Sequence, residues 1–358
     1  MISEKDEGIH PPGQHRYWNE SFYFNFMCDP STSSSPDNTS PWGGAIRIGY
    51  SPNQGHRDGF IIFYFPDGKA GFIRYCDETQ YQKDVGRPVN AQAISLQCVE
   101  PFKVWKISYS GPIFVFDNPN DASNFHKITL SKLPSREVNI DLTFSCYHSP
   151  FDFHRAMKIR GISFKRLLEK LNPAYLLSHA ALGFKKLSSI LVMSGASHYE
   201  QAGFVNGAIT IDDQPHEFSG TGQRDHSWGV RDMRVINNWQ WFSCQFGEDL
   251  AFNATRVEFL GFQAIGGHAY YQGECHPLKN WTLDAQYDVT NKWAETFSLT
   301  LTLENGTQLT ITGEAGINFP VLHATEGLTA QVNEALAVFH WNGQSSTGIS
   351  EFMGQLYP

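Results

Sequence analysis

One short stretch concentrates side chains that can transfer protons. Residues 220–232 read Gly-Thr-Gly-Gln-Arg-Asp-His-Ser-Trp-Gly-Val-Arg-Asp, with two Arg, two Asp, one His, one Trp and three Gly. Carboxyl and imidazole groups beside charges of both signs can be held in a chosen protonation state near neutral pH. The stretch therefore predicts a proton-transfer site. The alternative is a structural ion-pair network at the end of a strand, with the Trp as a core aromatic.

Within this stretch, Asp225 is the strongest candidate for a catalytic acid. Burial would raise the pKa of its carboxyl group, whereas a neighbouring Arg would lower it, and a simple salt bridge fits the sequence equally well. His226 is the second catalytic candidate, as an acid, a base or the group that positions Asp225. Trp228 is predicted to bind substrate through its ring face. The residues expected to tune the local charge are Arg224, Arg231 and Asp232.

Polar and aromatic residues elsewhere are secondary candidates. Glu200 is predicted to be catalytic, and Glu20 is worth testing beside it, because a carboxylate inside a β-pocket needs a reason to be there. The further residues predicted to bind substrate are Trp239, Trp241, Tyr199 and Tyr23. The alternative is ordinary core packing for the two Trp and a structural role for the others, and for each residue taken alone it is the stronger interpretation.

The sequence pattern predicts that most of the elements that position these groups are strands. Alternating segments such as 44–50 and 138–144 recur along the chain, and the turns at 66–69 and 304–307 are typical of hairpins. Repeated strands with turns between them predict a sandwich or a barrel. Helical spacing is confined to the region between about 156 and 195, which predicts a helical connector between two β units.

Composition limits the partners. The formal net charge is −9 and the pI is about 5.8, which argues against nucleic acid and anionic membrane surfaces as partners. We expect no stable membrane insertion, because no segment reaches the ~18 consecutive apolar residues of a span. A polar, acidic start and six scattered cysteines without CxxC spacing lead us to expect a cytoplasmic protein with free thiols.

Cofactor motifs are missing from the sequence. It contains no P-loop, no GxGxxG that follows a strand and opens a helix, and no GxSxG. The closest histidine pairs are His10 with His15 and His148 with His154, and neither has the HExxH spacing of a metal site. We therefore expect chemistry without a cofactor, and no metal.

The motif at 220–232 resembles the signature of the lipocalin-like carotenoid 1,2-hydratase (hydroxyneurosporene synthase)/AttH superfamily, which also includes fungal natural-product cyclases. Other patches look like a branch of that superfamily with paired N- and C-terminal domains. These patches are Asp6-Glu7-x-x-His10-Pro11, Trp18-x-Glu20-Ser21-x-Tyr23-Phe24-x-Phe26, Arg47-Ile48-Gly49-Tyr50-x-Pro52-Asn53 and His198-Tyr199-Glu200-Gln201-x-Gly203.

The resemblance implies an all-β fold of two lipocalin-like β-barrel or sandwich domains joined by the helical connector. The expected boundaries are 1–155, 156–195 and 196–358, with the motif in the last domain. In the hydratases the residues matching His226 and Trp228 are implicated in activity. They also use a Tyr and an Asp somewhat under thirty residues downstream, where this chain reads Asn-Ala-Thr-Arg-Val-Glu at 253–258. That departure puts hydration itself in doubt.

The leading hypothesis is a cofactor-independent enzyme, a cyclase (including cycloaddition), isomerase or hydratase. Its expected substrate is an apolar isoprenoid or polyketide-like small molecule held in a β-barrel pocket. The rival hypothesis is a non-catalytic lipocalin-like carrier of a similar hydrophobic ligand.

Overall fold

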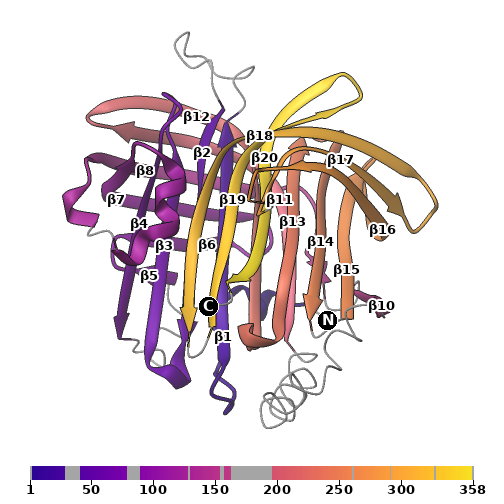
Figure 1. Ribbon diagram of the computed structural model, residues 1–358, viewed down its shortest axis with the longest axis horizontal. Helices are drawn as coiled ribbons and strands as arrows, with labels where there is room; N and C mark the ends of the chain where they lie inside the picture. The colour runs from indigo at the N-terminus through magenta and orange to yellow at the C-terminus, as the bar shows by residue number, and fades with distance from the viewer. Residues whose placement is uncertain are drawn as a thin grey trace.

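The computed structural model describes residues 2–28, 41–78, 89–127, 130–153, 157–162, 196–259, 262–290, 292–325 and 328–356. Its strands form two antiparallel sheets that lie side by side, one mostly indigo to magenta and the other orange to yellow in Figure 1. Among the described residues the helices are short 3-10 turns: η1 (Glu4–Glu7), η2 (Pro52–Gln54), η3 (Pro119–Lys127), η4 (Leu130–Lys132) and η5 (Met233–Val235). None of them is long and apolar enough to cross a membrane.

The first sheet closes on itself through a short pairing between β4 and β7, and we call it the N-terminal barrel. Its ring order is β4 (Ala70–Glu78), β3 (His56–Tyr64), β2 (Trp42–Ser51), β1 (Trp18–Cys28), β12 (Gln214–Val230), β11 (Ser197–Ile211), β8 (Ser135–Cys146) and β7 (Val104–Phe116). Three short strands extend this sheet: β5 (Val89–Ala91), β6 (Ile94–Glu100) and β9 (Phe151–Asp152).

The second sheet closes through β15 and β16, and we call it the C-terminal barrel. Its ring order is β15 (Phe262–Tyr271), β14 (Leu250–Phe259), β13 (Ile236–Phe246), β20 (Gln344–Leu356), β19 (Leu328–Trp341), β18 (Gln308–Thr325), β17 (Ala294–Leu303) and β16 (Glu274–Tyr287). The short strand β10 (Lys158–Ile162) pairs with the free edge of β15. The expected all-β, lipocalin-like fold is confirmed.

Local sequence explains the hairpins and the barrel interiors. The turns expected at 66–69 and 304–307 join β3 to β4 and β17 to β18, and Gly68 and Gly306 supply the positive φ that these turns require. Along β1, Phe22, Phe24 and Phe26 point into the barrel core, because alternate residues of a strand share a face.

The division between the barrels differs from the expected one. β11 and β12, which span residues 197–230 and carry the motif, pair with β8 and β1 and so belong to the N-terminal barrel. The salmon strands reach across to that barrel in Figure 1. Alternation identifies a strand but says nothing about its partner, so the sequence placed the motif in the wrong sheet. In the expected connector, residues 158–162 are a strand, and residues 163–195 lie outside the described residues.

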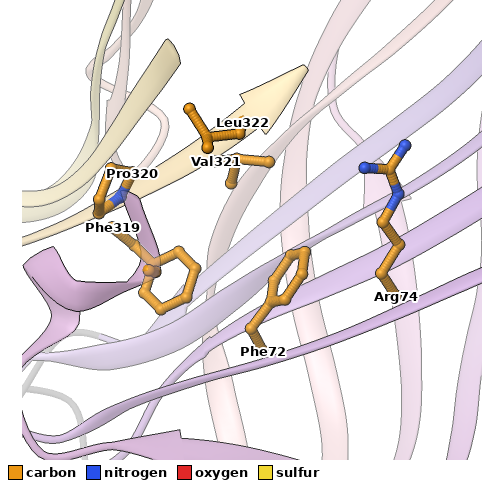
Figure 2. Close-up of a pocket in the computed structure, with 7 residues that line it drawn as sticks. Phe72, Arg74, Phe319, Pro320, Val321 and Leu322 are labelled. Atoms are coloured by element: carbon orange, nitrogen blue, oxygen red, sulfur yellow. The ribbon is translucent and has the colours of Figure 1, made fainter. Parts of the chain in front are cut away.

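The two barrels meet through an apolar layer that we call the seam. Its buried side chains on the N-terminal barrel are Tyr23, Met27, Ala45, Phe60, Ile62, Tyr64, Ala70, Phe72, Phe116 and Ala122, and those on the C-terminal barrel are Trp241, Phe319, Val321, Leu336 and Ile349. Figure 2 shows the ring of Phe72 facing Phe319, with their centroids 5.5 Å apart. The gap beside them measures only about 10 Å³, which is at most the space of one water molecule.

Phe319 should therefore hold the barrels together. Replacing it by Ala removes a ring that is 1% exposed and should lower the free energy of unfolding by about 3–5 kcal/mol. Urea denaturation followed by tryptophan fluorescence measures the change. Val289→Ala, at a fully exposed site, is the control and should leave the midpoint unchanged. Equal effects of the two substitutions would contradict a close-packed seam.

Candidate active site

The motif strand β12 divides its side chains between two buried environments. Arg224, His226 and Trp228 point into the N-terminal barrel, where their rings and guanidinium pack on core aromatics. Asp225 and Gln223 point to the opposite face, toward the C-terminal barrel. Successive residues of a strand face opposite ways, so Asp225 and His226 cannot share one pocket. Of the three roles considered for His226, the positioning of Asp225 is therefore not supported by this geometry.

On the inner face, Arg224 binds the start of the chain. Its Nη2 lies 2.5 Å from Glu7 Oε1, and it also donates to the side chain of Gln201. Glu7 accepts further hydrogen bonds from Tyr199 Oη at 2.8 Å and Trp105 Nε1 at 2.7 Å. Arg224 thus pairs with a residue more than two hundred positions away, not with its neighbour Asp225. Each buried charge is matched by its partner and by hydrogen bonds.

His226 extends the same network. Its Nε2 lies 2.9 Å from Glu20 Oε1, and its Nδ1 lies 2.8 Å from the carbonyl oxygen of Asp6. Glu20 Oε1 also lies 2.7 Å from Nδ1 of His10, whose ring stacks on Trp228 at 4.0 Å. Burial lowers the pKa of His226, although Glu20 opposes the shift. These contacts tie residues 6–10 to the barrel wall, which favours an anchoring role for His226, Trp228, Tyr199 and Arg224.

The outer face carries the carboxyl groups. Glu200 on β11 lies opposite Asp225 on β12, and Asp225 lies opposite Tyr23 on β1. Glu200 is completely buried, and it accepts hydrogen bonds from Gln223 Nε2 at 2.8 Å and Trp241 Nε1 at 3.2 Å. Trp241 belongs to the C-terminal barrel, so Glu200 links the two barrels.

Two more carboxyl groups face this row from the C-terminal barrel. Glu334 on β19 lies opposite Glu351 on β20, and a hydrogen bond joins their carboxyl groups. Tyr23 Oη donates to Glu334 Oε1 at 2.5 Å, and Trp239 Nε1 donates to Glu351. We call Glu200, Asp225, Glu334 and Glu351 the carboxyl cluster. Glu200 and Glu334 are buried, whereas Asp225 and Glu351 keep partial exposure.

Desolvation sets the protonation of the cluster. Burial raises the pKa of Glu200 to about 8, against the hydrogen bonds from Trp241 and Gln223. Desolvation raises the pKa of Asp225 to about 6, although His198 and Arg231 oppose it. Burial also raises the pKa values of Glu334 and Glu351, and the repulsion between two adjacent carboxylates raises that of Glu351 further. The cluster therefore holds protons near neutral pH, which a general acid requires.

The remaining predicted residues have simpler positions. Asp232 caps the turn η5 by accepting from the backbone N–H of Arg234, and it forms an ion pair with that side chain at 2.7 Å. Arg231 acts on Asp225 through its charge. The sequence missed Glu334 and Glu351. The available signal was a Glu in each of two alternating strands, at positions where the pattern requires a buried side chain.

Within the part of the chain that the structure describes, two groups of side chains have the composition of metal sites. One is His10, Glu20 and His226, and the other is His148, His268 and Cys275, with donor atoms within 4.8 Å of one another in each group. In the second group both ring nitrogens of His148 already make hydrogen bonds, to Ser149 O and from Ala202 N. Sequence spacing did not reveal either group, because the members come from distant strands.

The C-terminal barrel contains a cavity of about 480 Å³ at one end. Its size is suited to a small molecule. Trp239 lines this cavity and also donates to Glu351, so it connects the cavity with the carboxyl cluster. Polar and apolar atoms contribute about equally to the lining surface, whereas the sequence led us to expect a hydrophobic pocket. The lining side chains are Asn238, Trp239, Gln240, Arg256, Glu258, Gln263, Tyr287, Lys292, Gln331, Asn333, Phe352, Met353, Gln355 and Leu356.

Residues 3–355 match the family described as "Domain of unknown function (DUF7064)". The chain belongs to this family. A search of the curated proteins finds no match to this chain. Its fold is similar to that of a protein described as AttH from Nitrosomonas europaea, with a TM-score of 0.61 and 10% identity over 97% of this chain and 95% of that one. At this level of identity the likeness concerns the fold alone.

Two other solved structures are more distant. Kievitone hydratase from Nectria haematococca has a TM-score of 0.48 and 10% identity, with 94% of this chain and 88% of that chain covered. CghA with Sch210972 has a TM-score of 0.49 and 10% identity, with 95% and 89% covered. Membership in the carotenoid hydratases themselves is not shown.

Glu7 should be essential for stability. Glu7→Ala leaves Arg224 buried without the one carboxylate that it contacts among the described residues, so the free energy of unfolding should fall by about 3–5 kcal/mol. Chemical denaturation measures the loss. Glu4→Ala, on the same 3-10 turn but exposed, should have little effect. A wild-type midpoint for Glu7→Ala would contradict the anchoring role.

Glu200→Gln should flatten the pH dependence of stability. The pKa of Glu200 rises from 4.5 to about 8 on folding, so the folded state binds the extra proton in that window. The contribution of Glu200 to stability is then fully present below about pH 4.5 and is lost as pH rises toward about 8. Thermal unfolding midpoints measured across this window should fall less in Glu200→Gln than in wild type. Glu314→Gln, at an exposed site, should keep the wild-type slope, and identical slopes for all three proteins would exclude a proton on Glu200.

Proposed function

We propose that this protein is a cofactor-independent acid–base enzyme, a cyclase, isomerase or hydratase, whose proton donor belongs to the carboxyl cluster. The observation that carries the proposal is the meeting of four carboxyl groups between the barrels, with pKa values raised toward or above neutrality. A protein gains no stability from burying such groups unless they are neutral or paired. Proton transfer is a reason for keeping them.

Raised pKa values match the requirement of the reaction class. Protonation of an alkene or epoxide needs an acid that keeps its proton at neutral pH in a dry environment. Glu200 and Glu334 have that environment because they are buried. Asp225 and Glu351 are partly exposed, and they can return protons to the cluster from solvent. The hydrogen bond between Glu334 and Glu351 allows one proton to be shared by two carboxylates.

A cyclase or an isomerase needs no reactant besides its substrate, and a hydratase needs only water in addition. The donor carboxyl forms a new C–H bond by giving its proton to an alkene carbon, and the adjacent carbon becomes cationic. A cyclase or isomerase then loses a proton from a neighbouring carbon to the carboxylate, which regenerates the acid. A hydratase instead adds water to the cation, and the carboxylate takes the proton of that water. In each case the cluster ends in its starting state.

Aromatic rings beside the cluster suit a cationic intermediate. Trp241 and Tyr23 contact each other edge-on at 5.9 Å, and each hydrogen-bonds one of the cluster carboxyls. Trp239 hydrogen-bonds a third. Ring faces attract a cation by up to ~2 kcal/mol each in a dry site. A cycloaddition would need less, because a shaped wall can hold the substrate in a reactive conformer. An isoprenoid or polyketide-like substrate remains the proposed class.

Activity should depend on the outer face of β12 more than on its inner face. Purified protein is incubated with candidate polyenes and epoxides, and product is measured by mass spectrometry. Glu200→Gln, Asp225→Asn and Glu334→Gln should each lower turnover at least ~100-fold, the usual contribution of a general acid. The rate should also fall as pH rises through the range from about 6 to about 8, as Asp225 and Glu200 lose their protons.

The controls separate catalysis from folding. Glu314→Gln should keep full turnover, and His226→Ala should lose activity only in proportion to its loss of folded protein. Unchanged turnover in the three cluster variants would remove the cluster from the mechanism. A selective loss in correctly folded His226→Ala would move the site to the inner face.

A carrier of small molecules is the second candidate, and the 480 Å³ cavity favours it. A carrier should bind ligand stoichiometrically and release it unchanged after long incubation. Ligand recovered intact, together with tight 1:1 binding, would support the carrier and oppose the enzyme.

A further inference from the structure

The cavity of the C-terminal barrel has an unusual balance of charge. Arg256 and Lys292 line it with a single carboxylate, Glu258, whereas the whole chain carries a net charge of −9. Glu258 accepts from Asn238 Nδ2 at 2.7 Å. An excess of positive charge inside a cavity of an acidic protein attracts anions.

Arg256 has unused hydrogen-bonding capacity. A guanidinium has five N–H donors. Nη1 donates to Gln240 Oε1 at 3.2 Å and Nη2 donates to the carbonyl of Trp281 at 3.1 Å, whereas the buried Nε has no partner. The guanidinium also lies 4.1 Å from the centroid of the Trp281 ring. Stacking and two hydrogen bonds hold the group in place while leaving donors unmatched.

No carboxylate of the described residues forms an ion pair with Arg256. Lys292, the second cation of the cavity, likewise meets only an amide in that part of the chain, with its Nζ 3.1 Å from Gln331 Oε1. By contrast, two other partly buried Arg residues form ion pairs, Arg47 with Asp58 and Arg57 with Asp77. Burial lowers the pKa of Arg256, as expected for a cation that lacks such a partner.

We propose that the cavity of the C-terminal barrel binds a small organic anion, with the carboxylate of the ligand held by Arg256 and Lys292. A planar guanidinium pairs with a carboxylate through two parallel hydrogen bonds, which suits a fixed and stacked Arg better than a mobile cation. The ligand's apolar part meets the remaining lining. Those apolar side chains are Trp239, Phe352, Met353 and Leu356.

The cavity adjoins the carboxyl cluster at Trp239, but the proposed anion site uses Arg256 and Lys292 and does not depend on the proposed catalysis. Its test measures binding alone, by isothermal titration calorimetry on the full chain. The probes are 1-naphthoate, cinnamate and decanoate, each compared with its uncharged primary amide, and inorganic phosphate is tested as an anion without an apolar part. At least one carboxylate should bind 1:1, and its amide should bind at least ~10-fold more weakly, because a charged hydrogen bond contributes about 1.5–3 kcal/mol.

Variants locate the binding. Arg256→Gln should weaken carboxylate binding at least ~10-fold, and Lys292→Gln should weaken it by a smaller factor. Arg256→Lys keeps the charge and should restore part of the affinity. Lys106→Gln changes the net charge equally at an exposed site of the N-terminal barrel, and it should bind as wild type does. Circular dichroism confirms that each variant is folded.

Several outcomes would overturn the proposal. They are the absence of saturable binding across all three carboxylates, equal binding of acid and amide, competition by phosphate at equal concentration, and wild-type affinity in a folded Arg256→Gln. Retained carboxylate binding with no turnover in any assay would support this site while leaving the proposed enzyme unsupported, so the two ideas can fail separately.

Discussion

Strand β12 is covered on both faces along most of its motif, and most of the architecture follows from that constraint. A strand turns successive side chains to opposite sides, and both sides are covered here, one by the barrel core and the other by the second barrel. Every polar group on such a strand needs a partner. On the inner side Glu7 and Glu20 supply those partners from the beginning of the chain. On the outer side, carboxyl groups and indoles of both barrels supply them.

The two sides satisfy this requirement in different ways. The inner side uses opposite charges, as between Arg224 and Glu7, so desolvation is offset by attraction. The outer side gathers groups of like charge, and there the solution is to keep protons bound. Burying a neutral carboxyl group costs less free energy than burying a carboxylate. This advantage is lost as the pH rises and the groups lose their protons. A fold accepts such a cost where activity depends on it.

Much of the architecture could be predicted from the sequence because it depends on local chemistry. The turns at 66–69 and 304–307 and the alternation of the strands are short-range features, and both were predicted correctly. The partner of β12 could not be predicted in this way, because pairing with β1 joins residues about two hundred positions apart. The boundary at 196 was misplaced for the same reason.

The candidate site was predictable in part. Glu200, Asp225, Tyr23 and Trp241 lie together as a set of substrate and acid candidates should. Adjacent positions in a strand already imply that Asp225 and His226 diverge, so this separation could have been foreseen. Glu334 and Glu351 could not, because they carry no motif and become neighbours only when β19 and β20 pair across the barrel wall.

The anchoring of the first ten residues also has a consequence for the order in which the protein is made. Glu7 is synthesised 217 residues before its partner Arg224. Strand β1 is likewise synthesised about two hundred residues before β12, the strand with which it pairs. Domains usually complete their folding from the N-terminus during synthesis. Here the N-terminal barrel cannot close until β12 has been synthesised, so residues 6–10 and β1 reach their final places only after that strand is available.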